Sequence, residues 1–534
     1  MPLPFLISRA PGAGVTRSIQ AASARLRRAG PTAALALVVA LCGCASLPPP
    51  VQGPPTHHFV DTAGTPLGTM LQPQLAAHAE RSGVLVLRDG REALAARLEL
   101  TELAQRSIDV QYYIWHDDAS GREMIGALVR AAQRGVRVRV LLDDNSTRGL
   151  DRVLAYFDAP RNIEVRLFNP FVHRRFRLLS LLTDFDRLDR RMHNKSFTVD
   201  NQATIVGGRN IGDEYFNAGS VMDFVDLDVL AVGPIVEHVS SDFDRYWASP
   251  WSYPLAQVVP VERLRASLAA PASKGDAAAV AALRDDGSIA RGERTIRDWL
   301  SGQGPIEWTS VHLVSDDPAK IAGEASAADT VVGQLRRALG EPTRELEIVS
   351  AYFVLEPADI DLLTGWAHHG VAISVLTNSL AATDVPAVHA GYAKSRKPLL
   401  DAGVRLFEMQ PGAAPPPTTQ HYGSSSASLH AKTFAVDRKR IFIGSYNVDP
   451  RSRNLNTEMG FVIDSPALAG GLADLFAKEI PQRAWQLQLS PSSQLQWLDR
   501  QAGHTVVLDH EPQVSALRLL LVKLLSLLPI DGQL

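Results

Sequence analysis

The chain has 534 residues, enough for more than one hydrophobic core, and its 46% hydrophobic and 21% charged residues are an ordinary globular composition. Its formal net charge of −3 argues against bulk binding to nucleic acid. Basic and aromatic residues are not interleaved as they are in single-strand binders, so we expect no nucleic-acid partner.

The N-terminal region carries a targeting pattern. Arginines at 25, 27 and 28 precede an apolar run at 33–41, which is too short to span a bilayer and is followed by Cys42, Gly43 and Cys44. The pattern resembles a bacterial lipoprotein signal, so we expect residues 1–43 to be removed and Cys44 to be lipidated. Plain secretory cleavage is the alternative. The expected location is the cell envelope, facing the periplasm. Ala45 after the lipidated cysteine does not decide between the inner and the outer membrane.

Residues 44–80 are predicted to form a tether. Prolines at 48–50 and 54–55 favour a stiff, polyproline-like spacer between the lipid anchor and the folded body. Cys42 and Cys44 are the only cysteines, so a mature chain that keeps at most Cys44 has no internal disulfide.

A first domain is predicted at 81–265. Residues 121–134 have helical spacing, with Met124, Leu128 and Ala131 on one face, and Gly135 is a stop signal before an apolar strand. Such strand–helix–strand repetition is typical of layered α/β domains.

The first chemical motif is His193-Asn-Lys195-Ser-Phe-Thr-Val-Asp200. Apolar residues alternate along it, which predicts a strand with His193 and Lys195 on one face. Asp200 lies at an odd offset, so it turns to the opposite face and is interpreted as a structural support rather than a proton carrier.

A strand predicted at 203–206 ends in Gly207-Gly208-Arg209-Asn210. Glycine lets a backbone approach an anion closely, and the Asn210 amide near a lysine ammonium is a donor set suited to phosphate. Farther on, Asp226 is a candidate to orient an imidazole by accepting its second N–H.

A second domain is predicted at 326–490, after a connecting segment at 266–325. It repeats the motif as His430-Ala-Lys432-Thr-Phe-Ala-Val-Asp437, and the strand at 440–443 ends in Gly444-Ser445-Tyr446-Asn447. Glu458 takes the place of the orienting carboxylate. One copy could be a chance strand with a histidine, but two copies with matched Gly-x-x-Asn tails favour one active site built from two halves.

Several other residues have two interpretations. Arginines at 174, 175 and 177 meet anionic headgroups or belong to a solvated loop. Leucines at 514–528, within a C-terminal segment at 491–534, predict a helix that lies in a membrane interface or packs on the body. In the Pro/Ser-rich stretch 411–428, His421 and Tyr422 are weak candidates for substrate contact. Arg209 and Arg451 either reach distal phosphates or hold a carboxylate at a domain interface.

These motifs resemble the phospholipase D superfamily, and within it the bacterial cardiolipin synthases of the C type, over roughly residues 80–510. The resemblance implies an α/β fold of two similar phospholipase D-like α/β/α layered domains packed face to face with pseudo-twofold symmetry. The stretches that carry it, besides the two motifs, are 107–115, 191–195, 207–213, 376–380 and 449–452.

The chemistry that the resemblance implies is phosphatidyl transfer through a phosphohistidine. His193 is expected to be the nucleophile and His430 the acid. The catalytic set is then His193, Lys195, Asp200, His430, Lys432 and Asp437, with Asn210, Asn447 and Ser445 on the phosphate and Asp226 and Glu458 orienting the imidazoles.

We expect phospholipid substrates, membrane association, no metal, no cofactor and no obligate protein partner. The first half has Gly208 at the position where the second half has Ser445, so the halves are not expected to hold phosphate equally. Two other functions stay open on the residues alone: hydrolysis of phospholipid headgroups, and a nuclease or scaffold role in which lipid is not the substrate.

Overall fold

The computed structural model describes residues 47, 49–51, 56–218, 223–265, 274–285, 287–412, 427–501, 504–528 and 531–533. The predicted signal with Cys44, and the loop residues His421 and Tyr422, lie outside this part. The chain divides into two units, of which the smaller contributes residues 47, 49 and Val172–Phe185 to the described part. The segment Val172–Phe185 holds the short helices η2 (Arg174–Phe176) and α6 (Arg177–Thr183).

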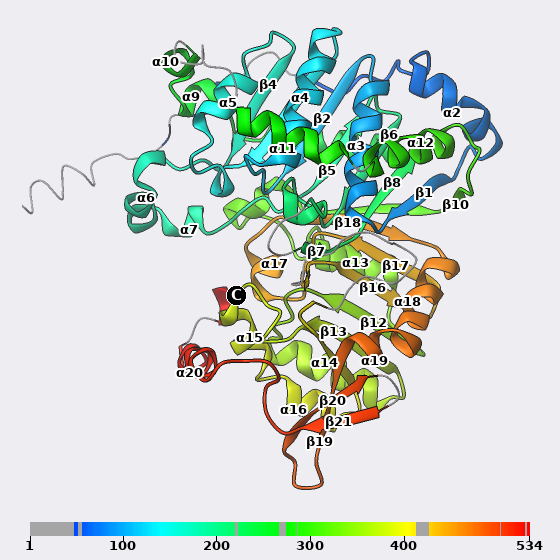
Figure 1. Ribbon diagram of the computed structural model, residues 1–534, viewed down its shortest axis with the longest axis vertical. Helices are drawn as coiled ribbons and strands as arrows, with labels where there is room; N and C mark the ends of the chain where they lie inside the picture. The colour runs from blue at the N-terminus through cyan, green and yellow to red at the C-terminus, as the bar shows by residue number, and fades with distance from the viewer. Residues whose placement is uncertain are drawn as a thin grey trace, which may run out of the picture. The chain divides into compact units, whose positions relative to one another are not determined.

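The first half of the larger unit is built on a nine-stranded mixed sheet (Figure 1). Its middle strands β2, β3 and β4 are parallel, and every other pair of neighbours is antiparallel. In spatial order the strands are β10 (Glu307–Thr309), β1 (Ser82–Leu87), β8 (Asp228–Val232), β6 (Ala203–Gly207), β5 (Ser196–Val199), β2 (Ser107–Tyr112), β3 (Arg137–Asp143), β4 (Ile163–Phe168) and β9 (Ser252–Pro254).

Helices cover this sheet, and α4 shows why they form where they do. Its N-cap Asp118 accepts a hydrogen bond from the amide of Gly121, its buried stripe includes Met124 and Leu128, and Gly135 follows its end at φ +99°. The helix therefore matches the predicted one, with a slightly earlier start. The helices of this half are α2 (Pro66–Ala77), α3 (Gly90–Leu103), α4 (Ala119–Gln133), η1 (Asp144–Ser146), α5 (Asp151–Phe157), α7 (Phe185–Leu188), η3 (Asp213–Tyr215), α8 (Ile235–Trp247), α9 (Leu255–Val258), α10 (Val261–Arg265), α11 (Lys274–Asp285) and α12 (Ser288–Leu300).

The second half repeats the arrangement on a ten-stranded sheet whose parallel middle is β12, β13 and β14. The hairpin β16–β17 takes the place of β5–β6, and β18 takes the place of β8. In spatial order the strands are β11 (Val311–Ser315), β18 (Met459–Ile463), β17 (Arg440–Gly444), β16 (Lys432–Val436), β12 (Glu345–Ser350), β13 (Ala372–Asn378), β14 (Arg405–Met409), β19 (Ala484–Leu489), β20 (Leu495–Gln501) and β21 (His504–Leu508).

The predicted domain boundaries do not coincide with the sheets. The connecting segment supplies β10 to the first sheet and β11 to the second, while β20 and β21 extend the second sheet past residue 490. Part of the predicted tether packs on the first half, where Arg139 donates to the carbonyl of Thr56 at 2.7 Å and α2 follows. The helices of the second half are η4 (Pro318–Ala322), α13 (Val331–Leu339), α14 (Pro357–His368), α15 (Pro386–Tyr392), α16 (Arg396–Asp401), α17 (Pro450–Asn454), α18 (Pro466–Lys478), α19 (Ile480–Arg483), α20 (Ala516–Leu525) and η5 (Asp531–Gln533).

The two halves share an apolar core. One cluster of buried residues combines Val206 and Val229 of the first sheet with Ile443 and Phe461 of the second. Burying such side chains from both sheets together removes them from water and holds the halves against each other. The fold is therefore the predicted pair of similar α/β domains packed together. None of the helices in the described ranges is both long and apolar enough to cross a bilayer.

Candidate active site

The backbone amide of each motif histidine forms a hydrogen bond with the backbone of the opposite half. The amide of His193 donates to the carbonyl of Thr457 at 2.8 Å, and the amide of His430 donates to the carbonyl of Val225 at 2.9 Å. The second contact continues a two-stranded parallel ladder between β7 (Asp223–Val225) and β15 (Ala427–Leu429). Because these residues pair with the other half, β5 and β16 begin only after the histidines, later than the alternation predicts.

Each imidazole likewise contacts the orienting carboxylate of the opposite half. Nδ1 of His193 lies 2.8 Å from Oε2 of Glu458, and Nδ1 of His430 lies 2.5 Å from Oδ2 of Asp226. The sequence predicts these two carboxylates but not that each serves the histidine of the other half. With Nδ1 held, Nε2 is the ring nitrogen left to face a substrate. Neither half alone contains a complete histidine–carboxylate pair.

The motif lysines lie beside the histidines and are buried. Nζ of Lys195 donates to the carbonyl of His193 at 2.5 Å, and Nζ of Lys432 donates to the carbonyl of His430 and lies 2.9 Å from its Nδ1. Burial lowers the pKa of Lys195 to about 7, with repulsion from Lys432 acting in the same direction. A cluster of buried cationic groups that repel one another is a site prepared for an anion.

The two histidines have lowered pKa values. For His193 the causes are burial, then the charges of Lys195 and Lys432, then His430, and together they place its pKa well below the ordinary value. Burial and Lys432 lower the pKa of His430, against the opposing effect of Asp226. Lys432 and His430 lower the pKa of His193, and Lys195 lowers the pKa of His430, so the charged residues of the two halves belong to one electrostatic site.

The carboxylates differ between the halves. Burial raises the pKa of Glu458 to about 7. Burial alone would also raise the pKa of Asp226, but the charge and hydrogen bond of His430, with Lys432, hold it well below its ordinary range. Asp226 is thus a fixed anion at neutral pH, whereas Glu458 is close to its titration point.

The Gly208/Ser445 difference matches the carboxylates. The hydroxyl of Ser445 donates to Oε2 of Glu458 at 2.5 Å. A Cβ on Gly208 would lie 2.2 Å from Oδ1 of Asp226, so the shorter carboxylate fills the space that a side chain would need. Ser445, predicted to bind phosphate, is instead seen with its hydroxyl on Glu458.

The two asparagines of the Gly-x-x-Asn tails are also unlike each other. Asn210 accepts from the amide of Ile114 at 3.1 Å and donates to the hydroxyl of Tyr215 at 3.0 Å. Asn447 is 4% exposed, and within the described part of the chain its Oδ1 is buried without a hydrogen-bond partner. An amide oxygen without a partner is costly unless a ligand, water or a protonated group meets it.

Asp200 and Asp437 occupy equivalent places away from the imidazoles. Asp200 accepts from the amides of Gln105, Arg106 and Ser107 at 2.7–2.9 Å. Asp437 accepts from the amides of Thr343, Arg344 and Glu345 and from the Thr343 hydroxyl. Each therefore fixes the start of a central strand, β2 or β12, which is the placement that a structural support requires. Both have positive φ, in the hairpin turn after the motif strand.

Aromatic side chains lie beside both histidines, and the motif spacing does not predict them. The ring of Tyr113 meets His193 edge-on at 5.0 Å between centroids. On the other side Tyr215 and Phe224 lie 5.3 and 5.0 Å from His430. Alternation along the 107–115 strand could have placed Tyr113 near its end, but nothing in the sequence connects Phe224 with His430.

The distal arginines make protein contacts. Arg209 is buried and donates to backbone carbonyls, among them that of Asp226. Arg451 donates to the carbonyl of Asp189 at 2.9 Å and pairs with its carboxylate, so it holds a carboxylate across the two halves, one of the two predicted alternatives.

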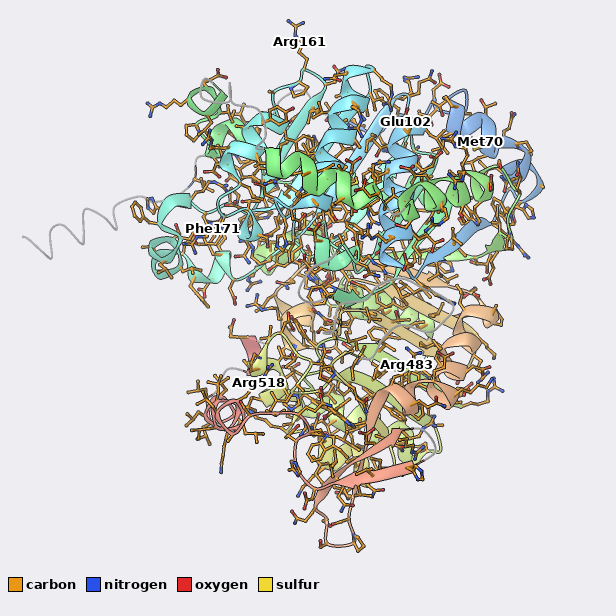
Figure 2. All side chains as sticks on the ribbon, viewed as in Figure 1. Met70, Glu102, Arg161, Phe171, Arg483 and Arg518 are labelled. Carbon is orange, nitrogen blue, oxygen red and sulfur yellow. The ribbon has the colours of Figure 1, made fainter. Side chains whose placement is uncertain are left out.

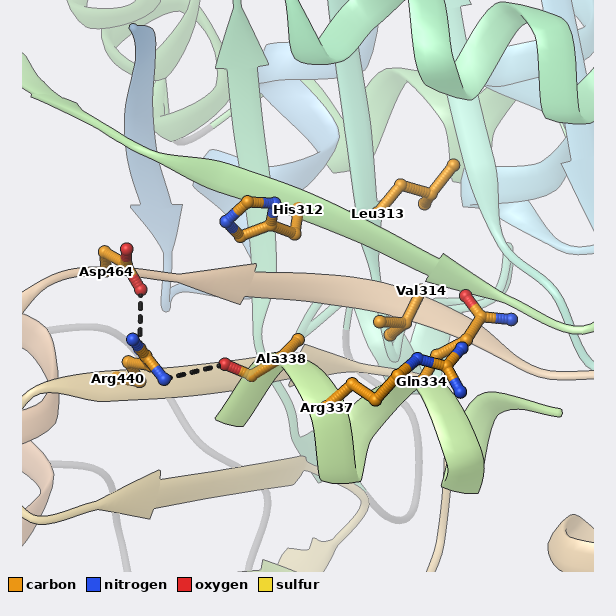
Figure 3. Close-up of a pocket in the computed structure, with 8 residues that line it drawn as sticks. All are labelled: His312, Leu313, Val314, Gln334, Arg337, Ala338, Arg440 and Asp464. Carbon is orange, nitrogen blue, oxygen red and sulfur yellow. Dashed lines mark hydrogen bonds and ion pairs between the residues drawn. The ribbon is translucent and has the colours of Figure 1, made fainter. Parts of the chain in front are cut away.

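Two other polar groupings contain no motif residue. In the described ranges one His/Asp/Glu group has ligand atoms within 4.8 Å of one another: His116, Asp118 and Glu214. Asp118 is already the cap of α4, and His116 pairs with Glu214 at 3.0 Å. A surface cavity of about 350 Å³ is lined by none of the predicted site residues. Figure 3 shows its lining, where Arg440 pairs with Asp464.

The geometry defines a class: two phospholipase D-like halves that contribute one His-x-Lys motif each to a shared site. Comparisons agree. Residues 98–247 and 335–480 match the family described as "Cardiolipin synthase, PLD-like domain". The chain is 46% identical over 471 residues to cardiolipin synthase C of Escherichia coli K12, covering 87% of this chain and 99% of that protein. It is 26% identical over 396 residues to a cardiolipin synthase of Staphylococcus aureus Mu50, covering 74% of this chain and 66% of that protein.

Among solved structures, phosphatidylserine synthase of Haemophilus influenzae Rd KW20 matches with a TM-score of 0.53 at 15% identity, over 87% of this chain and all of that one. This match concerns the fold. The chain belongs to the cardiolipin synthase family of phospholipase D-like proteins.

Proposed function

We propose that this protein is a phosphatidyltransferase that makes cardiolipin, passing a phosphatidyl group between phospholipids through a phosphohistidine. The observation that carries the proposal is the reciprocal pairing of His193 with Glu458 and of His430 with Asp226. Two imidazoles that are held on Nδ1 and share one buried site can act as nucleophile and as acid.

In the first step Nε2 of His193 attacks the phosphorus of the donor lipid. A nitrogen–phosphorus bond forms, the bond from phosphorus to the headgroup oxygen breaks, and His430 gives its proton to the departing alcohol. In the second step the hydroxyl of the acceptor lipid attacks, His430 takes the hydroxyl proton, and the nitrogen–phosphorus bond breaks. His193 and His430 return to their starting protonation states.

The assignment of the two roles follows from the carboxylates. A nucleophile must be unprotonated, and the pKa of His193 is well below its ordinary value. A general acid needs support for its imidazolium. Burial and Lys432 lower the pKa of His430 as well, but the permanent anion Asp226 beside it opposes them and stabilises the imidazolium. We therefore assign attack to His193 and proton transfer to His430.

Charge on the phosphoryl oxygens is assigned to the lysines. Lys195 and Lys432 lie within two residues of the reacting groups and are desolvated, so each ammonium stabilises a developing oxyanion more than it would in water. Asn447, whose Oδ1 has no hydrogen-bond partner among the described residues, and Asn210 would contribute polar contacts to the substrate. Ser445 would act through Glu458.

The substrates place the protein at a membrane. We propose that Cys44 is lipidated and anchors the chain on the periplasmic side of the cell envelope, as the arginine cluster and apolar run before it suggest. Metabolic labelling with a clickable fatty acid tests this: the native chain should be labelled and a Cys44→Ser variant should not.

The activity test is mass spectrometry of lipids after incubation of the protein with mixed phosphatidylglycerol and phosphatidylethanolamine vesicles. Cardiolipin that forms with the native protein and not with His193→Ala is the expected result. Vesicles of each lipid alone identify the donor and the acceptor. Phosphatidic acid as the main product would replace transfer with hydrolysis, and no product under any condition would overturn the proposal.

A further inference from the structure

Helix α20 presents an apolar face to solvent. Six leucines of this helix and the turn after it are 46–77% exposed, and their positions repeat at intervals of three and four, so they form one continuous stripe. No residue of the helix is buried. Figure 2 shows side chains projecting on several sides around the helix, which carries the labelled Arg518. The stripe consists of Leu517, Leu520, Leu521, Leu524, Leu527 and Leu528.

The opposite face holds the helix to the second half. Leu519, Val522 and Leu525 are half-buried, and a guanidinium nitrogen of Arg518 donates to the carbonyl of Thr383 at 2.7 Å. Just before the helix, Glu511 pairs with Arg396 at 2.6 Å. The orientation of α20 is thus fixed, and its leucine stripe points away from the protein because these contacts hold the other side.

Within α20 and the turn after it the charge has one sign. Between Pro512 and Ile530 the sequence contains two charged residues, Arg518 and Lys523, and no acidic one. Arg518 lies on the anchored side, and Lys523 is exposed. An exposed leucine face with a cation beside it matches the boundary between acyl chains and anionic headgroups. Ten helical residues extend about 15 Å, half of a bilayer's hydrocarbon thickness, so such a helix lies in the interface rather than across it.

The segment that holds α20 also contacts residues next to the catalytic site. Thr383, which accepts from Arg518, is followed by Asp384, whose carboxylate accepts from the hydroxyl of Tyr352 and influences the pKa of Lys432. On the strand before this segment, Asn378 makes two hydrogen bonds of 2.8 and 2.9 Å to the backbone of Leu429, the residue before His430. Helix α20 is therefore joined to the active site by one short polar segment.

We infer that the leucine stripe of α20 docks on an anionic phospholipid surface and so presents the catalytic residues to lipids of that same surface. The inference rests on the proposed function for the nature of the substrate, and on the stripe, the exposed Lys523 and the link to the site for the place of contact. It adds a second attachment to the expected lipid anchor, one that orients the enzyme instead of only tethering it.

The test follows the local environment of the stripe. In a full-length chain with Cys42→Ser and Cys44→Ser, a Leu521→Cys substitution is labelled with an environment-sensitive fluorophore and mixed with phosphatidylglycerol/phosphatidylcholine vesicles. We expect a blue shift that is quenched by lipids brominated on the acyl chain. The matched control is Val507→Cys on β21, equally exposed in the native chain at 49% against 46%, which should show neither effect.

Substitution gives the second readout. Leu517→Gln/Leu521→Gln/Leu524→Gln in the same background should lower the vesicle partition coefficient at least tenfold, with turnover of a monomeric short-chain phosphatidylglycerol unchanged. Val506→Gln/Val507→Gln should leave both unchanged. An unshifted label at 521, or triple-variant partitioning equal to that of the control, would overturn the inference, as would a dimer through this stripe that prevents vesicle binding. Membrane binding through 521 without turnover of any lipid would instead remove the proposed function.

Discussion

The first and second halves of this protein share strand order and motifs, yet they give their histidines different electrostatic support. His430 lies against Asp226, a short carboxylate packed on Gly208, whose pKa is well below its ordinary range. His193 lies against Glu458, a longer carboxylate that accepts from Ser445 and whose pKa burial raises to about 7. The two imidazoles therefore have unequal electrostatic support, which is the asymmetry that the proposed roles of nucleophile and acid require.

Removing the imidazoles one at a time should have the largest effect. We expect His193→Ala and His430→Ala each to lower transfer by roughly 10⁴-fold or more, because each performs an indispensable step. A phosphatidyl ester of p-nitrophenol separates their roles, since its leaving group needs no proton. On intact-protein mass spectrometry His430→Ala should accumulate a phosphatidyl adduct, and His193→Ala should carry none. An adduct on the second variant would reverse the assignment.

Neutralising the two orienting carboxylates should lower the rate by unequal factors. Asp226→Asn removes a permanent anion from the acid and should lower the rate roughly 10³-fold. Glu458→Gln keeps an oxygen for the Nδ1 proton of His193, so we expect a loss nearer tenfold. Initial rates of cardiolipin formation at pH 7 measure both, with near-ultraviolet circular dichroism as the folding control. Equal losses would mean that the two imidazoles do not differ in electrostatic demand.

Gly208 and Ser445, which lie next to the two carboxylates, can each be replaced by the residue found in the other half. Gly208→Ser places a Cβ 2.2 Å from Oδ1 of Asp226, so the carboxylate must move, and a displacement of about 1 Å can cost roughly 10²-fold in rate. Ser445→Gly removes one hydrogen bond to Glu458, about 1 kcal/mol or roughly fivefold. Rates of the two variants side by side test whether Gly208 exists to make room for Asp226; a Gly208→Ser enzyme of native activity would contradict it.

The dependence of the transfer rate on pH should report the titration of Glu458 in the second half and of Lys195 in the first. Formation of the nitrogen–phosphorus bond puts positive charge on His193, so the rate should rise as Glu458 ionises with its pKa near 7. It should fall again as Lys195 loses its proton, also near 7, because the neutral amine no longer stabilises the oxyanion. At pH 6 only roughly a tenth of Glu458 is ionised, so the native rate should drop there by several-fold.

Glu458→Gln is the control for this profile. The variant has no carboxylate to protonate, so its rate should not fall between pH 7 and pH 6. It should rise there as Lys195 becomes fully protonated, and it should fall on the alkaline side as Lys195 loses its proton. Stopped-time assays from pH 5.5 to pH 8.5 measure both chains. A variant that still loses activity between pH 7 and pH 6 would assign the acidic limb to another group.

Much of this arrangement follows from the sequence. The repeated His-x-Lys motifs, the alternation around them and the Gly-x-x-Asn tails predict two similar α/β halves and their chemical residues. The exchange of Asp226 and Glu458 between the halves could not be predicted, because strand pairing between segments about 200 or more residues apart leaves no local pattern. The same holds for Phe224 beside His430.

The motif strands show a local prediction overridden by tertiary structure. Alternation favours a strand that begins at His193, yet β5 begins at Ser196, because residues 191–193 use their backbone groups on the opposite half. The predicted boundary at 490 fails to capture β20 and β21 for a related reason. A sheet continues wherever an edge strand finds a partner, and composition does not record where that happens.

The smallest effect on activity is expected at Asp437. Its carboxylate accepts from three backbone amides at the start of β12, so Asp437→Asn should lower the free energy of unfolding by about 1–3 kcal/mol. Activity per folded molecule should be unchanged, because the side chain lies on the face opposite the imidazoles. Asp200→Asn, with the equivalent contacts in the first half, is the matched variant.

The pH dependence of this difference has a definite sign. Burial opposes ionisation, but the Thr343 hydroxyl and the backbone amides lower the pKa of Asp437 below its ordinary 3.8. The stability from this ionised carboxylate is complete above 3.8 and is lost as pH falls through the lowered pKa. Urea unfolding at pH 6 should therefore separate native and Asp437→Asn chains, and unfolding at pH 3 should separate them less. If the variant remained folded but lost turnover at pH 6, Asp437 would act in the chemistry and not as a strand support.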